Sequence, residues 1–239
     1  MKKLLVTTMA LALVFVVFKS NAQVSFGVKA GLNVADISQD FKESDWEEAT
    51  KMMFSYKAGL AVDYGLTDAL SIKSGIEWSV KGYANDLEEE FSDMDGVEVD
   101  GSAKTSLNYL EIPINVAYNI SGLQVYAGPY IGYAIGGKTI YDFTVSYEGG
   151  EMSVDEETTL VGVSDGYNPD DIGDNEMAVN MLDYGLNVGA GYKLGPAMIS
   201  AQYGLGLGNL SVMPEGSDTD AGDYKATNKV ISVSVSYFF

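Results

Sequence analysis

The chain has 239 residues, with 14 basic and 34 acidic side chains and a formal charge of −20. It contains no cysteine and no histidine, which excludes disulfides, thiolate metal sites and the commonest general base. All basic residues are lysine, and the acidic balance argues against nucleic acid as a partner, because phosphate binding needs a basic surface.

The first segment predicts a signal peptide over residues 1–22. Lys2 and Lys3 precede an apolar run over residues 4–18, and Ser20 and Ala22 supply small residues before a cleavage point at Gln23. A membrane anchor is the alternative, but the run is shorter than the roughly 18 residues that a membrane span needs. Residues 23–239 then form one mature domain.

The mature chain shows repeated period-2 alternation of apolar and small or polar residues, which is typical of strands with one apolar face. The predicted strands cover residues 24–34, 53–66, 70–83, 105–118, 123–136, 180–193, 197–207 and 229–239. Connections of about four residues alternate with much longer ones, as in bacterial outer-membrane barrels.

The last strand carries the clearest pattern. Val235, Tyr237 and Phe239 share an apolar face, while serines occupy the opposite face. A strand that ends in an aromatic residue resembles the insertion signal of outer-membrane barrels, and it predicts pairing with the first strand to close a barrel. An edge strand of a soluble sandwich is the alternative.

These patterns predict an all-β fold: an eight-stranded, antiparallel, up-and-down transmembrane β-barrel with short periplasmic turns and long extracellular loops. The main rival is a soluble lipocalin-type barrel, whose apolar face would surround a ligand. A small barrel has room inside only for modest side chains, so the bulky apolar set is expected to face lipid. The expected location is the outer membrane.

Acidic residues are concentrated in the predicted long loops. All but five of the 34 carboxylates lie there, the exceptions being Asp63, Asp68, Glu77, Glu111 and Asp183. Loops held in water beyond a membrane tolerate such charge density.

Several segments are similar to the PorT-like outer-membrane β-barrel family. They begin at Phe26, Lys73, Asn108, Tyr126 and Gly189, and the Tyr-Leu-Glu-Ile-Pro run from Tyr109 is the most specific. The resemblance implies an eight-stranded outer-membrane barrel. It also implies, by way of the family's named member, an association with protein secretion across that membrane.

Charged residues on the small face are expected to form a network inside the lumen. Its members are Lys29, Lys57, Asp63, Lys73, Glu77, Lys81, Glu111 and Asp183. Unpaired charges in so narrow a space would be costly, so a plug of ion pairs is the favoured interpretation, and a gated ion path is the alternative.

Enzymatic function has little support. Glu77 and Glu111 could act as an acid and a base, but the neighbouring lysines explain them better. Lipid hydrolases of this shape need a Ser–His pair, which the chain cannot supply. No cofactor is expected.

One loop is a candidate calcium site because it concentrates oxygen ligands. The candidate ligands are Asp165, Asp170, Asp171, Asp174 and Glu176. Their spacing does not match an EF-hand loop, and a solvated, partly disordered loop is the alternative. Divalent cations could also bridge such carboxylates to lipopolysaccharide.

The sequence therefore predicts a non-enzymatic outer-membrane protein whose acidic loops serve interaction or envelope stability. An accessory of a secretion machine and a narrow ion-conducting pore are the alternatives. Expected partners are outer-membrane lipid and lipopolysaccharide, the barrel-assembly machinery during insertion, and secretion-machine or extracellular proteins.

Overall fold

The computed structural model describes residues 24–41, 50–87, 97–217 and 224–239. The predicted signal peptide, residues 1–22, lies outside this part of the chain and stays a prediction. The described elements are β1 (Val24–Phe41), β2 (Met53–Gly65), β3 (Leu70–Asp86), β4 (Val97–Ile120), β5 (Leu123–Tyr147), β6 (Gly150–Gly162), η1 (Pro169–Asp171), β7 (Glu176–Val179), β8 (Leu182–Leu194), β9 (Ala197–Gly206) and β10 (Tyr224–Phe238).

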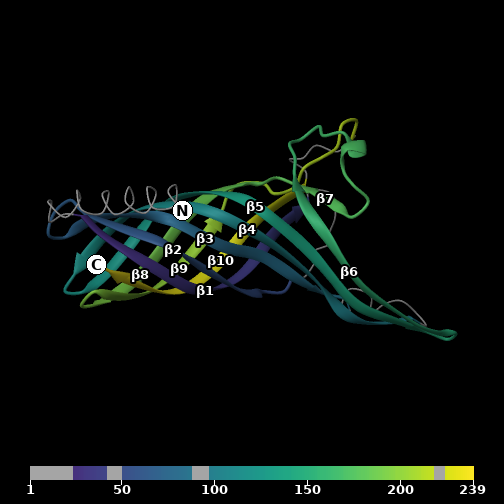
Figure 1. The fold of residues 1–239 in the computed structure, drawn as a ribbon, viewed down its shortest axis with the longest axis horizontal. Helices are drawn as coiled ribbons and strands as arrows, with labels where there is room; N and C mark the ends of the chain where they lie inside the picture. Colours follow the sequence, from purple (N-terminus) through teal and green to yellow (C-terminus); the bar gives the residue numbers. More distant parts are fainter. Residues whose placement is uncertain (1–23, 42–49, 88–96, 218–223) are drawn as a thin grey trace, which may run out of the picture.

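Within the described residues, eight strands form a closed antiparallel ring in the order β1, β2, β3, β4, β5, β8, β9 and β10 (Figure 1). The ring closes where β10 pairs with β1, from Gly27↔Phe238 to Phe41↔Tyr224. Closure satisfies the backbone groups of the first and last strands, which would otherwise be exposed edges. The predicted eight-stranded barrel is confirmed.

The two ends of the barrel differ. The short turns after β2, β4 and β8 lie at the same end as the start of β1 and the end of β10. In bacterial barrels this short-turn end faces the periplasm. No helix among the described residues is long and apolar enough to span a membrane.

The outer surface of the ring is an apolar band with aromatic residues toward both ends. Near the short turns the exposed aromatic residues are Tyr64, Tyr118, Tyr192, Tyr237 and Phe239. Toward the other end they are Phe54, Tyr56, Trp78, Tyr133, Tyr184 and Tyr203. Aliphatic side chains such as Ile112, Val188 and Val233 lie between them and are also exposed. An apolar band flanked by aromatic girdles is the lipid-facing surface of an outer-membrane barrel.

The sequence predicts one long loop over residues 137–179, and this prediction is wrong, because much of the segment forms strands. β5 continues to Tyr147, turns through Glu148 and Gly149, and β6 returns beside it. We call the projecting ends of β4, β5 and β6 (residues 97–104, 138–147 and 150–158) the arm (Figure 1). From Tyr133 to Tyr147 the strand extends about 45 Å, so the arm projects well past the aromatic band.

A local alternation that marks the arm is present in the sequence. Tyr141, Phe143 and Val145 alternate with more polar residues, and they pack over buried Leu87 and Val99. A β-bulge in β5 reverses which residues face inward. Asn108 pairs with Gly136 but Tyr109 pairs with Ala134, so Ile135 has no partner residue on β4 and is exposed. Inward-facing positions in β5 are therefore even-numbered before the bulge and odd-numbered after it.

Beyond the ends of the short strands β8 and β9, three short segments continue the barrel wall. We call these segments the collar (residues 159–162, 176–179 and 209–211). β6 pairs with β7 in parallel from Thr159↔Glu176 to Gly162↔Val179. Asn180 N donates to Leu210 O, and Leu210 N donates to Ala226 O on β10. The collar thus links β5 to β10 where β8 and β9 have already ended.

Candidate functional site in the barrel lumen

The inner wall of the ring carries small and polar residues, and one row of backbone pairs organises its charges. The row follows paired residues from β1 to β8: Lys29, Gly59, Glu77, Glu111, Gly132 and Asp183. The two glycines leave space between charged neighbours. A Cβ on Gly59 would lie 2.2 Å from Ile76 O, so the position admits no larger residue without a shift of the backbone.

Glu77 is held by two lysines. Lys29 Nζ lies 2.8 Å from Glu77 Oε1, reaching past Gly59, and Lys57 Nζ lies 3.2 Å from Glu77 Oε2. Lys57 and Glu77 are almost completely buried. Each carboxylate oxygen therefore faces an ammonium group, which offsets the cost of burying the charge.

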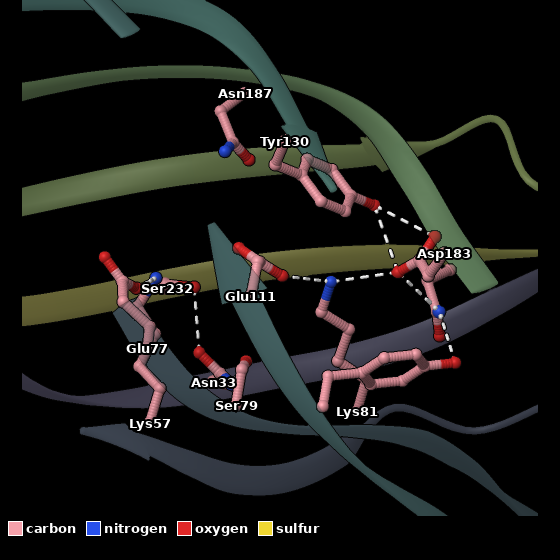
Figure 2. Close-up of polar contacts among 12 residues, drawn as sticks. Asn33, Lys57, Glu77, Ser79, Lys81, Glu111, Tyr130, Asp183, Asn187 and Ser232 are labelled. Atoms are coloured by element: carbon pink, nitrogen blue, oxygen red, sulfur yellow. Dashed lines mark hydrogen bonds and ion pairs between the residues drawn. The ribbon is translucent and has the colours of Figure 1, made fainter. Parts of the chain in front are cut away.

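Lys81 has the inverse arrangement and is shared by two carboxylates. Figure 2 shows its Nζ between Glu111 and Asp183, and the distance to Asp183 Oδ2 is 3.0 Å. Asp183 is fully buried and also accepts hydrogen bonds from Tyr130 Oη at 3.3 Å and Asn228 Nδ2 at 3.0 Å. The rings of Tyr130 and Tyr109 lie 4.3 and 5.2 Å from Lys81 Nζ, where they add cation–π attraction.

The two clusters balance each other. Two lysines on Glu77 give a net charge of +1, and one lysine with Glu111 and Asp183 gives −1. Glu77 and Glu111 are directly paired across β3 and β4, an arrangement that is unfavourable for like charges on their own. Lysines placed beside each of them turn this repulsive pair into a neutral network.

A third cluster lies toward the periplasmic end. Lys73 Nζ donates to Gln124 Oε1 and lies 4.9 Å from the Tyr126 ring. Lys193 Nζ lies 3.2 Å from Asp63 Oδ2, which Gln124 Nε2 also approaches at 3.4 Å. Sequence reasoning did not include Lys193 in the network, although it has the same strand parity as Asp183, which was included.

Between these clusters, hydrogen bonds of neutral side chains link different strands of the barrel wall. Asn33 is completely buried; it donates to Ser79 Oγ and Val80 O, and its Oδ1 accepts from Ser232 Oγ at 2.8 Å. Sequence reasoning also missed Asn33, Tyr109, Tyr130 and Asn228. Their inward parity was visible in the sequence, but their contacts join β1, β3, β4, β5, β8 and β10, and such cross-barrel contacts leave no local signal.

The arrangement closes the middle of the lumen. The space beside Lys29, Lys73 and Glu77 is about 20 Å³, enough for roughly one water molecule. A wider polar cavity of about 420 Å³, lined by Asp63, Ser71 and Lys193, lies at the periplasmic end. Side chains paired in this way are suited to holding the wall together.

The calcium candidates occupy a different region, around η1. Asp165 Oδ1 accepts from Met213 N, and Glu176 Oε2 accepts from Gly173 N. Asp170 and Asp171 lie in the first turn of η1 and are exposed, as is Asp174. Across the described ranges no group of three or more acidic side chains is placed to hold a metal, so the geometry does not support the calcium hypothesis.

The residues of the expected insertion signal lie on the lipid-facing surface at the end of β10, with Phe239 directly after the strand. Val235, Tyr237 and Phe239 are 52%, 48% and 72% exposed. The Tyr237 and Phe239 rings meet edge to face, with centroids 5.7 Å apart. Their role in insertion stays a prediction.

Comparison with known families gives a match over most of the chain. The model of the outer membrane protein beta-barrel domain family matches residues 19–212. No curated protein matches the chain in sequence.

Solved structures of small barrels are similar at 12% sequence identity. Ail, the attachment invasion locus protein of Yersinia pestis, has a TM-score of 0.39 over 91% of this chain and 99% of its own. Neisserial surface protein A has a TM-score of 0.38 over 90% and 99%. OprG from Pseudomonas aeruginosa has a TM-score of 0.36 over 91% and 96%.

Proposed function

The chain belongs to the outer membrane protein beta-barrel domain family, and from this premise we propose that it is a non-enzymatic surface protein that binds external partners through its arm. The arm carries this proposal. It extends the barrel wall beyond the aromatic band as an ordered sheet, and its turn and β6 are largely exposed.

Charge determines the kind of partner that the arm fits. Together with the turn at Glu148 and Gly149, the arm carries eight carboxylates and two lysines among the described residues. The acidic positions are Glu98, Asp100, Asp142, Glu148, Glu151, Asp155, Glu156 and Glu157. A sheet with this balance attracts cationic partners, whether basic protein segments or divalent cations that bridge to lipopolysaccharide.

The lumen favours this proposal over a pore. The central charges neutralise each other, and the space between them is about 20 Å³. The absence of histidine and cysteine from the sequence supports a role without catalysis.

Two measurements test the proposal. In planar bilayers the purified protein should show no steady conductance, and large, stable, ion-selective openings would establish the pore instead. In nanodiscs, a lysine decapeptide should bind with an affinity that falls as salt rises. The combined variant Glu148→Gln, Glu151→Gln, Asp155→Asn should weaken this binding several-fold.

A matched control removes charge at the other end of the molecule. Asp68→Asn in the periplasmic turn removes one charge and should leave decapeptide binding unchanged, whereas Glu148→Gln alone, which also removes one charge, should weaken it. Equal loss in both variants would mean that total charge, not the arm, attracts the peptide. Co-purification with secretion components, unaffected by neutralising the arm, would favour the accessory role that the PorT resemblance implies.

A further inference from the structure

The extracellular mouth of the barrel contains a pocket that the lumen network and the arm do not explain. Its volume is about 170 Å³. Ile37, Leu107, Leu160, Val179 and Leu210 line it, so both the barrel wall and the collar contribute. Leu107 and Leu160 are buried in one cluster with Tyr109 and Ala134, which forms an apolar floor above the charged network.

Two hydrogen-bond acceptors interrupt this apolar lining. Asn228 is 1% exposed; its Nδ2 donates to Asp183 Oδ2 at 3.0 Å and approaches Tyr109 Oη at 3.4 Å. Because the Asp183 carboxylate accepts hydrogen bonds, the amide nitrogen of Asn228 must face it. The carbonyl oxygen, Oδ1, therefore points away from these contacts. No donor of the described residues reaches Asn228 Oδ1, and Gln39 Oε1, also buried in this pocket, has none either.

A groove on the inner face of the arm adjoins the pocket. This groove has a volume of about 440 Å³ and shares Tyr83 and Thr105 with the pocket. Tyr141 and Phe143 supply aromatic surface, and Asn85 Oδ1 is another buried acceptor without a donor in the described chain. Among the described residues, the lining of the two cavities contains one charged residue, Glu156, and no lysine.

Apolar walls with buried acceptors define the chemistry of a ligand. A buried acceptor without a partner costs free energy, which a ligand with N–H or O–H donors would recover. A cavity of about 150 Å³ accommodates one benzene ring, so the pocket has room for a ring or a short alkyl chain. Glu156 and the acidic exterior favour a positive charge on the donor group.

We propose that the pocket binds a small amphipathic amine. Its ammonium group donates to Asn228 Oδ1 and Gln39 Oε1, and its apolar body packs among Leu107, Leu160 and Val179. The groove on the arm provides the path by which such a molecule enters from outside. This site is distinct from the acidic outer positions of the arm and does not depend on their binding a partner.

Titration calorimetry on the full mature protein in nanodiscs tests the proposal with three probes of one shape. Phenethylamine should bind saturably at one site, 2-phenylethanol at least tenfold more weakly, and 3-phenylpropionate not measurably. Equal affinity for the amine and the alcohol would overturn the assignment of a cation. No saturable binding of any probe would overturn the site and leave water as the partner of both acceptors.

Variants locate the binding. Gln39→Leu removes one acceptor at a partly exposed position and should weaken phenethylamine binding about tenfold. Gln202→Leu makes the same chemical change deeper in the lumen and should have no effect. Met177→Trp should fill the pocket from the collar and abolish binding, with circular dichroism confirming the barrel. Unchanged affinity in Gln39→Leu and Met177→Trp would refute the proposed location.

Discussion

Removing the ammonium group of Lys81 is the most direct test of the lumen network. In Lys81→Met the chain keeps a flexible apolar stem of similar length, but Glu111 and Asp183 lose the cation that they share. Asp183 retains Tyr130 and Asn228 as donors, whereas the Lys81 contact is the main compensation for Glu111.

The expected loss of stability follows from burial. The side chains of Lys81 and Glu111 are 5% exposed and that of Asp183 is 0% exposed. Removing one member of such a buried pair costs about 3–5 kcal/mol, because the remaining charge is left without compensation. An exposed ion pair contributes about 0–1 kcal/mol.

Urea unfolding of the protein in lipid vesicles, followed by tryptophan fluorescence, measures this difference. Lys138→Met is the matched control, because Lys138 pairs with Glu157 2.7 Å away while both side chains are about half exposed. The variant Lys81→Met, Glu111→Gln, Asp183→Asn removes all three charges and should recover most of the stability.

A difference below about 1 kcal/mol between Lys81→Met and Lys138→Met would refute the reasoning, because the lumen pair would then behave as a surface pair. Failure of the triple variant to recover stability would show that packing of the lysine stem, and not charge, dominates.

Three further experiments probe the backbone and the ends of the chain. Gly82→Ala should cost about 1–3 kcal/mol in the same urea assay, because φ is +150° and a Cβ would meet Thr105 O, whereas Gly136→Ala enters open space and should cost less than 1 kcal/mol. Phe239→Ala should reduce the amount of protein in the outer membrane several-fold, measured by immunoblot of membrane fractions; a Val233→Ala variant with an equal deficit would contradict a specific insertion signal. N-terminal sequencing of the purified protein should begin at Gln23, and a sequence beginning at Met1 would contradict cleavage.

Local sequence determined the strand pattern and, up to the bulge in β5, the side that each residue of the predicted strands faces. Alternation in residues such as Ile231, Ser232 and Val233 depends only on the two-residue period of a strand, so the barrel and its lipid-facing surface were predictable. The same period put Lys29, Glu77 and Asp183 on one face. The arm also has a local signal, since Tyr141, Phe143 and Val145 alternate with more polar residues, although the spacing of the predicted strands predicts a loop there.

Only the tertiary structure decided which inward residues meet. Register between strands places Gly59 between Lys29 and Glu77, and it brings Lys81 to carboxylates on β4 and β8 that are 30 and 102 residues away in sequence. The bulge at Ile135 reverses which residues of β5 face inward. The collar brings residues of β6 and β7, together with Leu210, over the extracellular mouth of the barrel. Such contacts depend on how the ring closes, and closure is a property of all the strands together, which no single strand encodes.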